Sequence, residues 1–91
     1  MRAEYDLAGK VIGLAMKVHR TLGSGFLEKV YRNTLQVELL RAGLTVEVEV
    51  PIQIRYEGVI IGDYVADLVV NGQLIVEIKA VVALAAAHEV Q

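Results

Sequence analysis

Residues 46–56 are Val-Glu-Val-Glu-Val-Pro-Ile-Gln-Ile-Arg-Tyr, with an apolar or aromatic side chain at every second position. Successive side chains of a strand point to opposite faces, so this pattern predicts a β-strand with one dry face. Pro51 has no N–H to donate, which indicates either an edge strand or a break into two short strands. The alternation therefore predicts a sheet that packs one face against other elements.

Two further strands are predicted after this one. Glu57-Gly58 predicts a turn, and residues 59–70 predict a second strand with a bend at Gly62. Asn71-Gly72 is a strong hairpin signal, and residues 73–79 predict a third strand. Together these segments predict a three-stranded antiparallel meander.

Helical periodicity precedes the strands. Apolar residues recur at steps of three and four over residues 4–22 and again over residues 26–42, which predicts two amphipathic helices. Ser24 or Gly25 is expected to cap the start of the second helix, and Gly43 its end. Residues 80–91 are rich in alanine and predict a C-terminal helix. This order of helices and strands along the chain predicts an α+β fold and a single domain over residues 1–91.

Composition excludes several classes of protein. The chain has 91 residues, 55% of them hydrophobic, a net charge of -2 and no cysteine. This excludes intrinsic disorder, disulfide scaffolds, thiolate zinc sites and nucleic-acid binding by bulk positive charge. The longest wholly apolar stretch, residues 80–87, is too short to span a membrane, and we find no signal peptide. We therefore expect a cytoplasmic protein with no membrane contact.

Three charged residues lie among apolar neighbours on the last two predicted strands. Glu77 and Lys79 are two residues apart, so they share a face of the third strand. A two-residue loop at Asn71-Gly72 would place Asp67 on the opposite face. A three-residue loop, residues 70–72, pairs Asp67 with Ile75 and places it on the face of Glu77 and Lys79. We choose the second register because it leaves the other face wholly apolar.

These charges allow two interpretations. Crowded carboxylates repel each other, and a hard divalent cation such as Mg²⁺ or Mn²⁺ would relieve that repulsion, while the lysine could hold a phosphate or a water. Alternatively, the three residues form a solvated surface with ordinary ion pairs. Glu28 borders the buried face of the second helix and is either a further site residue or a helix-capping glutamate. Tyr31 is either an accessory site residue or part of the core. His88 and Gln91, three residues apart on the last predicted helix, are weaker candidates.

Several motifs occur in an order that is similar to a known family. They are Val18-His19-x-x-Leu22-Gly23-x-Gly25-x-x-Glu28-x-x-Tyr31, Tyr64-x-Ala66-Asp67-Leu68, Ile75-Val76-Glu77-Ile78-Lys79-Ala80-Val81 and His88-Glu89-x-Gln91. Together they resemble the GxxExxY protein family of the PD-(D/E)xK nuclease-like superfamily, over about residues 7–91. The resemblance implies a mixed sheet flanked by helices, with Asp67 and Glu77 as metal-binding carboxylates and Lys79 as the catalytic lysine. Glu28 would be an additional carboxylate near the metal, and Gln91, with His88, the glutamine of the helix that follows.

The resemblance implies a Mg²⁺- or Mn²⁺-dependent nuclease, active or inactive, that hydrolyses phosphodiesters of nucleic acid. The alternative is a non-catalytic interaction or dimerisation module that keeps the nuclease-like fold. Ala66 replaces the proline of the superfamily name, and we expect the domain to be incomplete at its C-terminus, without its last strand. An open sheet edge and apolar helices then predict a homo-oligomer, most simply a dimer.

Overall fold

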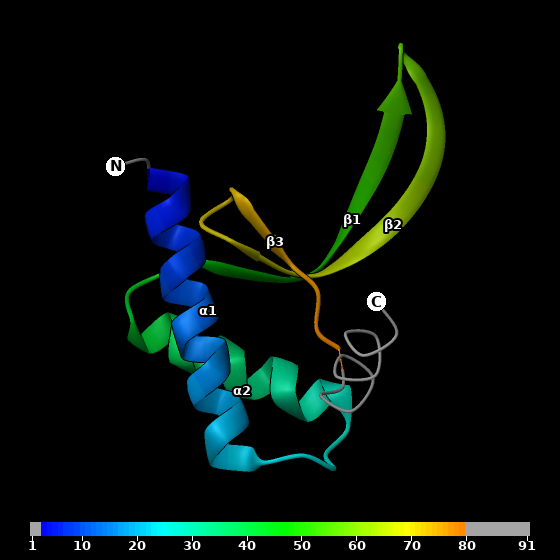
Figure 1. Ribbon diagram of the computed structural model, residues 1–91. Coiled ribbons are helices and arrows are strands. Elements are labelled where there is room, and N and C mark those ends of the chain that lie inside the picture. Colours follow the sequence, from blue (N-terminus) through cyan, green and yellow to red (C-terminus); the bar gives the residue numbers. More distant parts are fainter. Residues whose placement is uncertain (1–2, 80–91) are drawn as a thin grey trace, which may run out of the picture.

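The computed structural model describes residues 3–79, which form two helices followed by three strands. The helices are α1 (Ala3–Leu22) and α2 (Glu28–Arg41). The strands are β1 (Val46–Tyr56), β2 (Val59–Val70) and β3 (Leu74–Val76). Figure 1 shows α1 and α2 crossing on one side of a curved sheet. The predicted α+β architecture is confirmed for these elements, and the predicted helix over residues 80–91 lies outside the described residues.

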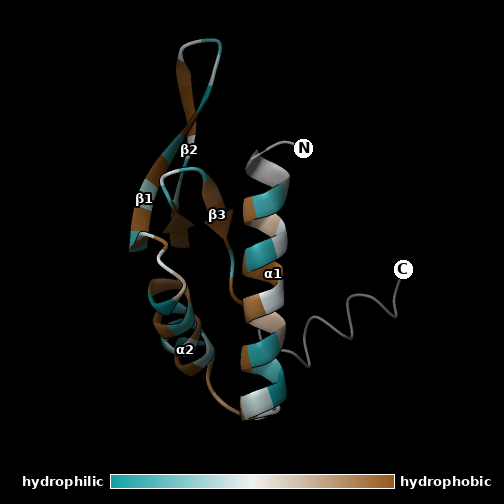
Figure 2. Ribbon diagram, turned by 90° about the vertical axis from the view of Figure 1, so that its left-hand side faces the viewer, coloured by the Kyte–Doolittle hydropathy of each residue, from teal (hydrophilic) through white to brown (hydrophobic). Residues whose placement is uncertain are grey.

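The helices pack through the apolar positions that define their periodicity. Val11 and Val18 of α1 are buried, as are Leu35 and Leu39 of α2. Seen from the side, apolar and polar residues alternate along both helices, as expected for amphipathic elements (Figure 2). At the surface, Lys17 Nζ of α1 lies 3.2 Å from the Oε1 atom of Glu38 of α2. The helical layer is therefore held by buried aliphatic contacts, to which an exposed ion pair of this kind adds about 1 kcal/mol or less.

The two ends of α2 differ in how closely they follow the sequence prediction. At the C-terminus, Gly43 has φ 84°, its N–H donates to Leu40 O, and Leu44 N–H donates to Leu39 O. This is the Schellman arrangement expected for a glycine after a helix. The prediction for the N-terminus is wrong, because Leu27 is the N-cap and provides no side-chain hydrogen bond. Gly25 has φ 106°, outside the extended region that an N-cap needs, and the helix begins three residues beyond it, at Glu28.

The sheet has the order β1-β2-β3, with β2 in the middle. Its apolar face carries Ala66, Leu68 and Val70, each 0% exposed, and the latter two join α1 and α2 in the main core cluster. β1 runs without a break through Pro51, so the edge-strand alternative is the one the structure adopts. Between Ile54 and Arg55 the β1–β2 register shifts by one residue, close to the bend expected at Gly62. The sheet therefore follows the predicted meander.

The β2–β3 hairpin has three loop residues, as predicted, but they are residues 71–73 and not 70–72. Val70 pairs with Leu74 and Leu68 with Val76, so Asp67 is not opposite Ile75. Asn71 and Gly72 take the two left-handed conformations, φ 52° and φ 64°. The Asn71 side chain also accepts hydrogen bonds from the N–H and the hydroxyl of Thr45. Because a shift by two preserves the alternation of faces, the predicted shared face of Asp67 and Glu77 is retained.

The third strand is shorter than predicted. It ends at Val76, whereas the sequence predicted a strand to Lys79. Beyond Val76, the backbone N–H groups of Asp67 and Ile78 donate to side-chain carboxylates of Glu77 and Asp67, where a regular ladder would have backbone carbonyls as acceptors. Over the described part of the chain, no helix combines the length and the hydropathy needed to cross a lipid bilayer.

Candidate functional site

Asp67 and Glu77 come together where the β2–β3 ladder ends. Ile78 N–H donates to Asp67 Oδ2 at 2.6 Å, and Asp67 N–H donates to Glu77 Oε2 at 3.4 Å. Each residue therefore places its carboxylate on a backbone amide of the opposite segment. This reciprocal arrangement satisfies two amides that the shortened strand leaves without carbonyl partners. It also fixes both carboxylates on the same side of the sheet.

Tyr64 is a third member of this group that the sequence argument did not single out as a site residue. Its hydroxyl donates to Glu77 Oε2 at 3.2 Å. Tyr64 lies three residues before Asp67, so strict alternation places it on the opposite face, and the signal that could have drawn attention to it is its position in the motif Tyr64-x-Ala66-Asp67-Leu68. Partial burial, the hydrogen bond to Glu77 and the charges of Glu77 and Asp67 raise the pKa of the Tyr64 hydroxyl above 10.0. The phenol therefore stays protonated and available as a donor at neutral pH.

The Tyr64 pKa predicts a loss of stability at high pH. Because the folded pKa lies above the unfolded one, the stabilisation is complete below pH 10 and is lost as the pH rises through the raised value. We expect Glu77→Gln to bring the pKa of Tyr64 back toward 10, since it removes the negative charge next to the hydroxyl. An NMR titration of the tyrosine ring carbons measures this directly. An unchanged pKa in Glu77→Gln would show that Glu77 has no influence on Tyr64.

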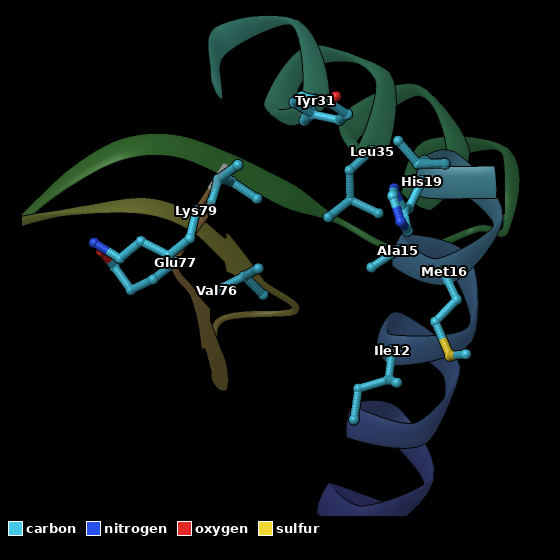
Figure 3. Close-up of a pocket in the computed structure, with 11 residues that line it drawn as sticks. Ile12, Ala15, Met16, His19, Tyr31, Leu35, Val76, Glu77 and Lys79 are labelled. Carbon is cyan, nitrogen blue, oxygen red and sulfur yellow. The ribbon is translucent and has the colours of Figure 1, made fainter. Parts of the chain in front are cut away.

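Lys79 follows Glu77 by two residues at the rim of an apolar cavity. The cavity has a volume of about 350 Å³ and lies between α1, α2 and residues 76–79. Figure 3 shows Met16 and His19 on the α1 side, while the Glu77 and Lys79 side chains extend away from the helices. Lys79 is exposed and forms no ion pair with any side chain of residues 6–79. Its ammonium group is therefore on the same segment as Glu77 and available to a ligand.

Glu28 is not gathered into this group. It is the first residue of α2 and is exposed, where a carboxylate stabilises the helix dipole. Within the described chain, no three His, Cys, Asp or Glu side chains are grouped closely enough to hold a metal ion. The structure thus brings Asp67 into contact with Glu77. The role of Glu28 as a third metal ligand stays a prediction.

Tyr31 has the contacts of a structural residue. It is 7% exposed, its hydroxyl donates to Gly23 O, and it accepts a hydrogen bond from Phe26 N–H. The Phe26 ring meets the Tyr31 ring edge-on, with centroids 6.2 Å apart. These contacts hold the loop between α1 and α2, which contains Gly23 and Phe26, against α2. They agree with the interpretation of Tyr31 as a core residue. The other accessory candidates, His88 and Gln91, lie outside the described residues.

The donor set at Asp67 and Glu77 fits a hard divalent cation. Asp67 Oδ1 and Glu77 Oε1 take no hydrogen bond from the described residues, so each carboxylate keeps one oxygen for another ligand. Mg²⁺ is commonly held by one or two carboxylates and completes its octahedral shell with water and substrate oxygens. The chain has no cysteine, and the two groups that meet here are carboxylates, which suit a hard cation such as Mg²⁺ better than zinc.

Comparison with known proteins also indicates a relationship to nucleases. A family model described as the PD-(D/E)XK nuclease superfamily matches residues 5–91. No curated protein and no solved structure matches the chain. Nucleases of this superfamily generally use divalent metals, and the matched region contains the Asp67, Glu77 and Lys79 group. Because the match extends over nearly all of its length, the chain belongs to the PD-(D/E)XK nuclease superfamily.

Proposed function

We propose that this protein is a metal-dependent nuclease that hydrolyses phosphodiester bonds of nucleic acid with Asp67, Glu77 and Lys79. The observation that carries the proposal is the pair of carboxylates at the end of the β2–β3 ladder: Asp67 accepts from Ile78 N–H and Glu77 accepts from Asp67 N–H, and a lysine follows Glu77 by two residues. Within the superfamily, we propose the GxxExxY family, on the residues Gly25, Glu28 and Tyr31.

Each residue of the group has a distinct task in this proposal. Asp67 and Glu77 would hold a divalent ion, and Glu28 would be a further carboxylate for it. A Mg²⁺ or Mn²⁺ ion, when bound, would polarise the phosphate and lower the pKa of the attacking water. Lys79 orients that water or a phosphate oxygen through the three N–H donors of its ammonium group. Tyr64 keeps the Glu77 carboxylate in place through its hydroxyl. Hydrolysis joins the water oxygen to phosphorus and breaks the bond to the leaving oxygen, the water gives up one proton to solvent, and the leaving oxygen takes one from solvent.

Metal binding tests the proposal without assuming a substrate. We expect Mg²⁺ or Mn²⁺ at about 100 times its Kd to raise the Tm of the full chain by about 10 °C. Asp67→Asn should remove this rise because it removes one anionic ligand. Glu47→Gln is the control, since Glu47 is an exposed β1 carboxylate opposite Val69 and not part of the group.

Cleavage is measured on the same preparations with labelled DNA and RNA, in the presence of metal and in EDTA. We expect metal-dependent cleavage by the wild type and by Glu47→Gln, and none by Asp67→Asn. No rise in Tm at millimolar metal, together with intact nucleic acid, would contradict the proposal and favour the non-catalytic module.

A further inference from the structure

One residue of β1 has a backbone conformation that is foreign to strands. Three non-glycine residues of the described chain have positive φ, and two of them, Glu57 and Asn71, lie in turns. The third, Glu49, has φ 54° within β1. The left-handed conformation brings the Cβ atom of an L-residue close to the following carbonyl oxygen, so it persists only where the surroundings compensate its cost. Glu49 is therefore a strained position inside a strand.

Glu49 lies directly across from Asp67. The β1–β2 register pairs residues 48 and 50 with residues 68 and 66, but it includes no Glu49–Asp67 pair. At this gap in the pairing, the Asp67 N–H donates to Glu77 Oε2 at 3.4 Å. The strained residue thus faces one of the two carboxylates of the proposed metal site.

Arg32 of α2 holds the Glu49 side chain. Its Nη1 atom lies 3.1 Å from Glu49 Oε1, and the Arg32 side chain is only 15% exposed. Residues opposite each other in an antiparallel pair share a face, so a regular strand would place Glu49 beside Asp67, on the face that the helices do not cover. The left-handed conformation departs from this alternation, and the carboxylate meets a helix residue instead. The ion pair with a mostly buried arginine compensates the strain.

We propose that Glu49 is a positioning residue of the metal site: its left-handed backbone, held by Arg32, interrupts the β1–β2 ladder opposite Asp67 and so leaves the Asp67 amide to Glu77. This inference rests on the proposed function, because it names what arranges the two carboxylates. Backbone strain clusters at functional sites, and replacing the groups that orient metal ligands typically changes metal affinity by about 10–100-fold. Glu49 acts through Asp67 and takes no part in the reaction itself.

Three substitutions of Glu49 separate the effect of its backbone from that of its charge. Glu49→Gly and Glu49→Val both remove the carboxylate and the pair with Arg32, so they differ in the backbone that they permit. Glycine populates positive φ about as readily as negative φ, so the apparent Kd for Mn²⁺ should rise about twofold. Valine disfavours positive φ, and a left-handed fraction below about one tenth raises the Kd at least tenfold. Glu49→Gln still accepts a hydrogen bond from Arg32 and should bind Mn²⁺ like the wild type.

Calorimetric titration of Mn²⁺ into the full chain measures these affinities. Glu47→Val is the matched control and should leave the Kd unchanged, because Glu47 is an exposed β1 carboxylate with a regular partner, Val69. Valine favours the extended strand, so metal-free Glu49→Val should melt at or above the wild-type Tm although it binds Mn²⁺ more weakly. A residue that only stabilised the fold would not give this combination. Equal Kd values for Glu49→Gly and Glu49→Val would overturn the proposal.

An NMR comparison without metal keeps the test independent of the proposed function. In the wild type, Glu77→Gln should move the amide resonance of Asp67, because this amide donates to the Glu77 carboxylate. The same substitution should leave that resonance in place in the Glu49→Val background and move it again in the Glu49→Gly background. Equal movement in the wild-type and Glu49→Val backgrounds would overturn the role of Glu49.

The two measurements fail in different ways. A wild type that binds no Mn²⁺ would contradict the proposed function, and the NMR comparison would still decide whether Glu49 arranges the carboxylates. Glu49→Thr, which is also β-branched, replaces Glu49→Val if that variant does not fold.

Discussion

Replacing Lys79 with methionine is expected to lower the rate of metal-dependent phosphodiester cleavage by about 100-fold or more. Methionine keeps the length and the apolar stem of the side chain but has no ammonium group to orient water or phosphate. Lys79 is exposed and has no ion pair with the described residues, so its loss should leave the fold intact. Single-turnover cleavage of a labelled oligonucleotide with saturating metal measures the effect.

The metal affinity separates the role of Lys79 from that of the carboxylates. Lys79→Met should retain the metal-induced rise in Tm, whereas Asp67→Asn should lose it. Lys10→Met is the control, because Lys10 is an exposed lysine on a different element, α1. Equal cleavage by Lys79→Met and the wild type would remove the lysine from the proposed mechanism.

Truncation of Leu39 to alanine should have the largest effect on stability. Leu39 is 0% exposed and belongs to the core cluster that joins α2 to α1 and the sheet. Removing a buried leucine side chain costs about 2–5 kcal/mol, a large part of the roughly 5–15 kcal/mol that stabilises a domain. Urea unfolding followed by circular dichroism gives the free energy of unfolding.

The neighbouring residue provides a control for the same substitution. Leu40 is 53% exposed, and Leu40→Ala should change the free energy of unfolding by less than about 0.5 kcal/mol. Both substitutions place alanine in the same turn of α2, so helix propensity cancels between them. Similar losses for the two variants would show that the buried position of Leu39 does not determine its contribution.

The faces of the sheet were predictable because alternation alone determines them. The apolar residues of β2 and β3 predicted which side meets the helices, and Ala66, Leu68 and Val70 are indeed buried. Alternation specifies register only up to a shift of two residues. The choice of residues 71–73 for the loop depends on Asn71 and Gly72, which both adopt positive φ. Local turn chemistry, and not hydrophobic pattern, therefore decided the pairing.

The site was predictable in part for a similar reason. Asp67, Glu77 and Lys79 could be grouped because alternation predicts that they share a face, and Asp67 and Glu77 do meet. The contact of Tyr64 with Glu77 could not be anticipated, since it depends on the early end of β3 and on a side chain that departs from strict alternation. The start of α2 was missed because Gly25 has a backbone conformation that sequence periodicity does not report.

The three-residue turn between β2 and β3 restricts how this chain can evolve. A slip of the β2–β3 pairing by one residue would turn every side chain of β3 to the other side of the sheet. Glu77 would then be directed toward the helices, apart from Asp67. Changes in the length of this turn are therefore compatible with the paired carboxylates only where the pairing of Val70 with Leu74 is kept.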